Sequence, residues 1–181
     1  MSRVSQQVLS PQLKLRLTHG GENWRGRRKQ PRPIATGRAM HVVIRSSLAK
    51  GEGSFLSPRH ARFIREQLSR LTQRFGITVY EFSNVGNHCH LLIRPRTRDA
   101  LKQFLMALCG RIAQHITGAR RGKPLGKRFF DSIPFTRIVP WGRAFILARG
   151  YVLQNALEAA GHYKRKTNLP KLGRPPDLEK T

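Results

Sequence analysis

Two predicted strands, separated by a very short connection, constrain the fold of this chain more than any other feature. The first runs from Ile77 to Ser83, and the second carries His88 and ends near Arg94, with the turn-like residues 84–87 between them. A link this short fits an antiparallel hairpin, because parallel strands need a crossover of about a dozen residues or more. The sequence therefore predicts an antiparallel sheet here.

Periodic patterns on either side of this hairpin complete the predicted element order. Ser57 and Pro58 suit the N-cap and first position of a helix, Thr97 suits a second N-cap, and Gly76 and Gly161 suit helix ends. The other predicted elements are a strand at 38–45, helices at 58–75 and after 97, a strand at 135–139, and a last helix from about 141 to 160. The order β-α-β-β-α-β-α predicts an α+β fold, a ferredoxin-like antiparallel sheet with two helices on one face.

Length and charge indicate the domain layout and the class of partner. The chain has 181 residues, with 35 Lys and Arg against 9 Asp and Glu, and a net charge of +26. Such a charge attracts polyanions, and nucleic acid is the expected partner. We expect one domain at 37–162 between a basic N-terminal arm (1–36) and a basic C-terminal tail (163–181), both flexible and punctuated by Gly and Pro.

The sequence favours a cytoplasmic protein without membrane contact. The first residues lack the apolar core of a signal peptide, and no apolar run approaches the roughly 20 residues that span a bilayer. Cys89 and Cys109 both lie in apolar patterns, so we expect buried thiols rather than a disulfide.

His88 and His90 are the first candidate site residues. Side chains alternate along a strand, so both imidazoles point to one face while Cys89 and Leu91 point to the other. Two histidines at this spacing can bind one divalent metal ion. The pair also fits a polar, solvated sheet face, because the motif is short.

Tyr151 and Asn155 are further candidates on the last predicted helix. They lie four residues apart, so their side chains stack on one helix face. The amide oxygen of Asn155 can complete a set of neutral ligands with the two histidines, and such a set suits Mg²⁺ or Mn²⁺ acting on phosphate. The alternative is a packing tyrosine with a wet hydroxyl and an ordinary surface asparagine.

A basic loop at 118–128 precedes Phe129 and Phe130. Charges that follow a phosphate backbone, next to rings that stack on bases, are typical of single-stranded nucleic acid binding. The two rings can equally anchor the loop in the core. The candidate nucleic-acid contacts of the whole chain are Arg25, Arg27, Arg28, Arg32, Arg45, Arg94, Arg96, Arg120, Arg121, Lys123, Lys127 and Arg128.

Three segments together resemble the single-tyrosine HUH transposases, in particular the REP-associated tyrosine transposases. They are Gly86-Asn87-His88-Cys89-His90-Leu91-Leu92, Arg128-Phe129-Phe130-Asp131 and Tyr151-Val152-Leu153-Gln154-Asn155, within a similarity that runs from about Arg32 to His162. The resemblance implies that residues 37–162 are a catalytic domain of a DNA strand nuclease and transferase.

The resemblance also implies roles for individual residues. His88, His90 and Asn155 would hold Mg²⁺ or Mn²⁺, and Tyr151 would attack the scissile phosphate of single-stranded or hairpin DNA. The product would be a 5′-phosphotyrosine link and a free 3′-hydroxyl, which can reverse the step or join another end. Relatives include monomers and dimers, so either a monomer or a homodimer is expected.

The residues leave alternatives to this interpretation. Ala156 follows Asn155 where many relatives have proline, and Gln154 is an alternative third ligand. His41 and His162 are, by location only, candidates to accept the phenol proton. The rival hypotheses are a non-catalytic regulator that binds hairpin DNA or RNA on the same scaffold, and a basic RNA-binding or ribosome-associated α+β protein.

Overall fold

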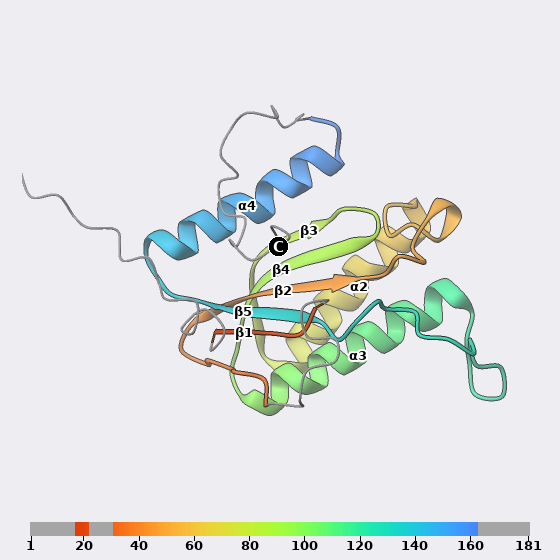
Figure 1. Cartoon of the computed structure of the whole chain (residues 1–181), viewed down its shortest axis with the longest axis horizontal. Helices are drawn as coiled ribbons and strands as arrows, with labels where there is room; N and C mark the ends of the chain where they lie inside the picture. The colour runs from red at the N-terminus through yellow and green to blue at the C-terminus, as the bar shows by residue number, and fades with distance from the viewer. Residues whose placement is uncertain (1–16, 22–30, 163–181) are drawn as a thin grey trace, which may run out of the picture.

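An antiparallel sheet of five strands, in the order β1-β5-β2-β4-β3, organises the chain (Figure 1). The computed structural model describes residues 17–21 and 31–162. The elements are β1 (Thr18–His19), β2 (Ala39–Arg45), a 3₁₀ turn (Gly51–Gly53), α2 (Pro58–Phe75), β3 (Ile77–Asn84), β4 (His88–Pro95), α3 (Arg98–Thr117), β5 (Phe135–Val139) and α4 (Arg143–Ala159). Strands β2 to β5 and helices α2 and α3 make the predicted ferredoxin-like α+β fold, which is confirmed, including the antiparallel hairpin β3–β4.

Local capping explains where the helices begin and end. The Thr97 hydroxyl accepts a hydrogen bond from the Ala100 amide at 3.0 Å, as an N-cap should. Gly76 and Gly118 end α2 and α3 in the left-handed conformation. Ser57 occupies the N-cap position of α2, but its side chain makes no capping hydrogen bond there.

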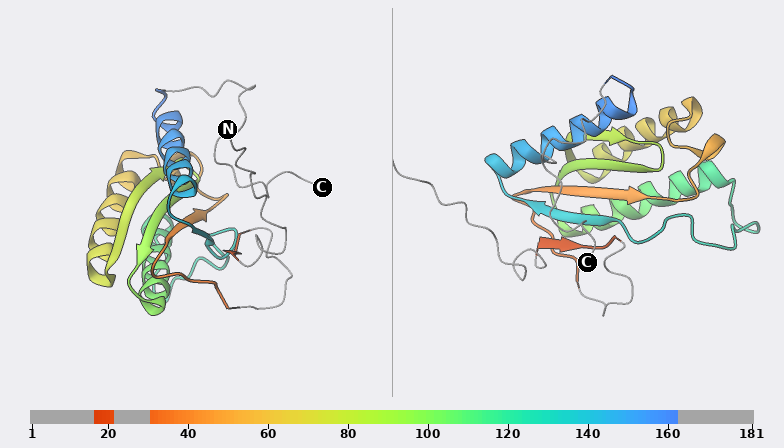
Figure 2. Two further views of the ribbon diagram at one scale, coloured as in Figure 1. Left: turned by 90° about the vertical axis from the view of Figure 1, so that its left-hand side faces the viewer. Right: turned by 45° about the horizontal axis from the view of Figure 1, so that its top comes forward.

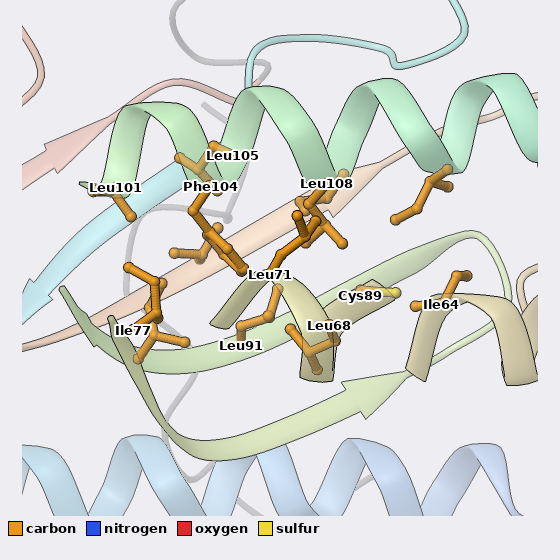
Figure 3. Close-up of a cluster of buried hydrophobic side chains, with 14 of the residues drawn as sticks. Ile64, Leu68, Leu71, Ile77, Cys89, Leu91, Leu101, Phe104, Leu105 and Leu108 are labelled. Carbon is orange, nitrogen blue, oxygen red and sulfur yellow. The ribbon is translucent and has the colours of Figure 1, made fainter. Parts of the chain in front are cut away.

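The sheet has a helical layer on each face. Helices α2 and α3 pack together on one face, and α4 crosses the opposite face over β3 and β4 (Figures 1 and 2). The main core fills the space between the sheet and the helix pair (Figure 3). It is built from alternate strand residues and the apolar helix stripes, including Met40, Val42, Ile44, Ile64, Leu68, Leu71, Cys89, Leu91, Ile93, Leu101, Phe104 and Leu108.

Strand β1 was not expected, because it lies within the predicted basic arm. Thr18 and His19 are buried and pair antiparallel with β5, opposite Arg137 and Thr136. Part of the segment before residue 37 is therefore an edge strand of the sheet. Short strands of this kind cover the open backbone groups of a neighbouring edge.

Two expectations on cysteines and membranes can be compared with the structure. Cys89 and Cys109 are both free thiols, as predicted, and burial raises the pKa of Cys109 to about 12. Within residues 17–21 and 31–162, no helix is long and apolar enough to cross a membrane.

Gly76 gives a stability prediction. Its φ of 61° is left-handed, and a Cβ there would lie 2.8 Å from Cδ of Arg96. We expect Gly76→Ala to lower the free energy of unfolding by about 1–2 kcal/mol. Gly110 lies inside α3 with open space around it, so Gly110→Ala should instead stabilise the protein by about 0.5–1 kcal/mol. Urea unfolding of the two variants measures the sign of the change in the free energy of unfolding for each. If Gly110→Ala lowered this free energy as much as Gly76→Ala, that result would contradict the prediction.

Candidate active site

The two histidines of β4 face α4 rather than solvent. Cys89, Leu91 and Ile93 belong to the main core, and the alternation of the strand therefore turns His88, His90 and Leu92 to the opposite face. His90 is only 4% exposed, and His88 is half-buried. The interpretation of the pair as a solvated sheet face is wrong, because α4 covers this side of the sheet.

Helix α4 is held on the sheet by a small apolar cluster and an ion pair. Ala148 packs with Ala39, Leu92 and Val139, and Tyr80 and Phe145 pack against this cluster. The guanidinium Nε of Arg149 lies 3.3 Å from Oε2 of Glu81 on β3. These contacts fix which side of α4 faces the sheet. Val152 and Asn155 lie on that side and are buried, with Tyr151 half-buried beside them.

Tyr151 lies against the histidine cluster of its own chain. Its ring centroid is 5.5 Å from that of His90 and 6.0 Å from that of His41, and both contacts are edge-to-face. The rings of His88 and His90 are 4.7 Å apart. The expected meeting of a phenol from the last helix with two imidazoles from the central hairpin therefore occurs within one chain.

Of the two alternative α4 ligands, Asn155 is the better placed. Asn155 is 8% exposed, and its Nδ2 donates to the carbonyl oxygen of Tyr151 at 2.7 Å. This bond leaves the amide oxygen Oδ1 as the group available to another partner. Gln154 instead donates to Oε1 of Glu158 at 3.2 Å. The structure therefore favours Asn155 over Gln154 as a candidate ligand.

Each of the two imidazoles is contacted at Nδ1 by a neighbouring side chain. Nδ1 of His88 lies 2.6 Å from Oδ1 of Asn87, which can only accept, so His88 donates from Nδ1. Nδ1 of His90 lies 3.1 Å from Nε2 of His41. Such contacts fix ring orientation and, in metal sites, leave the other ring nitrogen for the ion.

Burial keeps the three imidazoles neutral at neutral pH. It lowers the pKa of His90 to about 3, with a smaller contribution from His88. Burial also holds the pKa of His41 well below its usual range, helped by His90 and the positive charge of Arg137. The pKa of His88 is lowered by burial and by Arg45. Neutral imidazoles retain the lone pair that metal binding requires.

Two buried polar atoms at the histidine pair indicate independently that a divalent cation fits this site. Nε2 of His90 and Oγ of Ser83 are buried, and neither has a hydrogen-bond partner among the described residues. Ser83 is the direct cross-strand partner of His90, so both atoms lie in one place on the sheet. Buried polar atoms are rarely left unsatisfied, and a cation with its water ligands would supply the missing partners. In the described ranges no three His, Cys, Asp or Glu side chains are grouped to hold a metal, so a third ligand would have to be of another kind, such as the amide of Asn155.

The lowered pKa values predict acid destabilisation. A histidine whose pKa is lower in the folded than in the unfolded state makes the unfolded chain bind more protons, so stability falls as pH falls from about 6.5 towards the folded value. Between pH 7 and 5 the loss should be on the order of 2 kcal/mol for His90, whose pKa is about 3, and His41 should add to it in the same direction. Thermal melts should show a smaller drop in Tm for His90→Gln than for wild type. His162 is exposed, so His162→Gln should behave as wild type; equal drops in all three proteins would contradict the assignment.

Arg45 places a positive charge beside the histidine pair. It is the cross-strand partner of His88 and therefore lies on the same sheet face. Its Nε lies 3.5 Å from Oδ2 of Asp131. The amide and hydroxyl of Ser47 donate to Oδ1 of the same carboxylate, each at 2.8 Å. Asp131, which sequence reasoning had not assigned a role, thus orients Arg45 next to the site.

The other predicted nucleic-acid contacts are dispersed over the molecule. Arg32 is half-buried, and its Nη1 donates to the carbonyl oxygen of Pro134 at 2.9 Å and to the Thr136 hydroxyl at 2.6 Å, so it tethers residues 31–36 to β5. Arg25, Arg27 and Arg28 lie outside the described residues. The exposed members are Arg94, Arg96, Arg120, Arg121, Lys123, Lys127 and Arg128.

Phe129 and Phe130 anchor the basic loop in the core. Phe129 is 7% exposed, packs on Phe55 at 6.3 Å between ring centroids, and contacts Phe130 at 4.9 Å. Base stacking on Phe129 would require this contact to open. Of the two interpretations that the sequence allowed, the structure favours the core anchor.

Sequence reasoning missed the partners of the two imidazoles. From the sequence alone, Asn87 lies in the segment that carries the resemblance but has no role of its own, and His41 is a candidate only for accepting the phenol proton. The signal for His41 was its alternation with Met40 and Val42, which places it on the non-core face of β2. Its contact with His90 depends on the strand register, which the sequence does not contain.

Comparison with known proteins gives a fold relationship. No protein-family model and no curated protein matches the chain. Among solved structures, the chain is similar to a REP-associated tyrosine transposase bound to a REP hairpin, with a TM-score of 0.55 over 76% of each chain and 9% sequence identity. At this identity the similarity shows a distantly related fold.

Proposed function

We propose that this chain is a metal-dependent DNA strand nuclease and transferase that acts on single-stranded or hairpin DNA. One observation carries the proposal: the ring of Tyr151 on α4 lies edge-on to His90 on β4, 5.5 Å between centroids. A nucleophile, neutral nitrogen donors and an amide oxygen are thereby gathered on one sheet face. This combination suits phosphoryl transfer better than simple binding.

The reaction is a transesterification at phosphorus. The Tyr151 oxygen forms a bond to the scissile phosphorus and loses its proton, while the bond from phosphorus to the 3′-oxygen breaks and that oxygen gains a proton. The 5′ end of the downstream strand is left on Tyr151 as a phosphodiester. Attack by a 3′-hydroxyl reverses the step and expels the phenol, so no external energy source is needed.

His88, His90 and Asn155 are the residues that would hold the Mg²⁺ or Mn²⁺ ion. Such an ion polarises a phosphate oxygen and offsets its negative charge. The chain itself contributes the position of the phenol, because α4 is fixed to β3 and β4 by the apolar cluster around Ala148. It also contributes a covered site, since His90 is buried beneath α4 and Asn155 is buried on the side of α4 that faces the sheet.

Charge and fold support DNA as the substrate. Arg45 lies beside His88 and is oriented by Asp131, where it can pair with a backbone phosphate. The exposed basic residues of loop 118–128 add positive charge elsewhere on the molecule, which attracts a polyanion. The structurally similar transposase was solved with a REP hairpin, which supports hairpin DNA as the class to test.

A labelled-oligonucleotide experiment tests this proposal. The full chain is incubated with Mn²⁺ and a pool of DNA hairpins with randomised single-stranded flanks, labelled at either the 3′ or the 5′ end. We expect the 3′ label to migrate with the protein on a denaturing gel, and the 5′ label to appear on a shorter free strand. Peptide mass spectrometry should place the adduct on Tyr151.

The same experiment also has outcomes that would overturn the proposed function. Tight hairpin binding without any adduct would overturn the enzyme proposal and support a non-catalytic regulator. A preference for RNA over DNA hairpins, again without an adduct, would support the RNA-binding hypothesis.

A further inference from the structure

His41 and His90 form a buried contact across two strands. In the β2–β4 register, His41 pairs directly with Leu92 and His90 pairs with Val43, so the two histidines are diagonal neighbours on one face. Diagonal neighbours are within reach only of long or aromatic side chains. His41 is 3% exposed and His90 is 4% exposed, so no bulk water competes for the contact.

The two rings are arranged for a hydrogen bond rather than for face-to-face stacking. Nε2 of His41 lies 3.1 Å from Nδ1 of His90, and the ring planes differ by 12°. Atoms of stacked rings are separated by roughly 3.5 Å or more. The shorter distance, with centroids 5.3 Å apart, therefore places the rings side by side in nearly one plane. In that plane an imidazole N–H points at the lone pair of its neighbour.

Only one proton is shared, so the direction of this bond decides the tautomer of His90. If His90 donates from Nδ1, its Nε2 carries a lone pair. If His41 donates, Nε2 of His90 carries a hydrogen and becomes a buried donor without an acceptor, since no group in residues 17–21 and 31–162 bonds it. An unsatisfied buried donor costs about 1–3 kcal/mol. A lone pair at the same place is satisfied by a cation.

His88 shows the same arrangement with an unambiguous direction. Its Nδ1 faces Oδ1 of Asn87, which can only accept, so the lone pair of His88 lies on Nε2. His41 contacts Nδ1 of His90 in the same way that Asn87 contacts Nδ1 of His88. A matched pair of Nε2 lone pairs results if His41 also accepts.

We propose that His41 is a positioning residue that accepts the Nδ1 hydrogen of His90 and thereby keeps the Nε2 lone pair of His90 available to a divalent cation. The inference rests on the proposed function, because it takes His90 as a metal ligand. It adds a residue from β2, far from the histidine motif in sequence, to the machinery of the site.

The test begins with the metal-free full chain, in which ¹⁵N NMR of the histidine rings reads the tautomer directly. His90→Gln identifies the His90 signals. We expect Nδ1 of His90 to be protonated and Nε2 to be unprotonated in the wild type. A protonated Nε2 in the folded wild type would overturn the proposal, whatever the variants do.

Two variants then separate positioning from packing. His41→Phe keeps the ring and removes the acceptor, and we expect His90 to lose the pure Nδ1–H form. Mn²⁺ binding, measured by electron paramagnetic resonance with MnCl₂ alone, should weaken about 10–100-fold. His41→Gln presents an amide oxygen near the place of Nε2 and should bind within about threefold of wild type. Wild-type affinity in folded His41→Phe would overturn the proposal.

These readouts do not depend on DNA, so the two proposals fail separately. If wild type forms no Tyr151 adduct while the tautomer and Mn²⁺ results hold, the nuclease proposal is overturned and the role of His41 stands. If the adduct forms and His90 is protonated at Nε2, the role of His41 is overturned alone.

Discussion

Tyr151→Phe is expected to abolish the covalent DNA adduct and to lower strand cleavage by on the order of 10⁴-fold or more, while leaving hairpin binding within about twofold of wild type. The phenyl ring can keep the edge-to-face contacts with His90 and His41, so α4 should stay in place. Only the attacking oxygen is removed. The measurement is the rate of transfer of a 3′ label to the protein, with binding followed separately by fluorescence anisotropy.

Tyr80 supplies a matched control. Its ring packs against Trp141 and Phe145 at 5.6 and 5.1 Å between centroids, on the same side of the sheet but in the apolar cluster. Tyr80→Phe also removes one hydroxyl and should form the adduct at the wild-type rate. An adduct that persists in Tyr151→Phe would show that another group is the nucleophile and would remove the basis of the proposed function.

Asn155→Ala is expected to lower the rate of adduct formation at limiting Mn²⁺ by about 100-fold, and to raise the Mn²⁺ concentration needed for half the maximal rate. The change removes the amide oxygen proposed as third ligand, and a site with two histidines alone is a poor one for a hard cation. It also removes the 2.7 Å bond from Nδ2 to the Tyr151 carbonyl oxygen, which is worth about 1 kcal/mol. A Mn²⁺ titration of the reaction rate measures the effect.

Two companion variants separate these contributions. Gln154 bonds Glu158 instead, so Gln154→Ala should leave the Mn²⁺ dependence within about twofold of wild type. Asn155→Asp keeps an oxygen ligand and loses the amide bond, so it should retain tight Mn²⁺ binding. A larger effect of Gln154→Ala than of Asn155→Ala would reverse the ligand assignment on α4.

The local elements were predictable because their signals are local. Thr97, Gly76 and the alternation of Cys89, Leu91 and Ile93 each act within a few residues of chain, and the structure has the helix ends and the core face where they indicated. The edge strand β1 was missed because Thr18 and His19 form too short a segment to show a period. Its pairing with β5 depends on a free sheet edge, which is a property of the assembled fold.

The sequence alone determined that His88 and His90 share one strand face, that Tyr151 and Asn155 share one helix face, and that the chain carries a net charge of +26. Only the tertiary structure decided that these two faces meet, that His41 contacts His90, and that Arg32 bonds to Pro134 and Thr136 within the protein. The physical reason is the distance along the chain over which each interaction acts. Periodicity follows from backbone geometry over a few residues, whereas strand register and helix docking follow from burial between segments far apart in the chain.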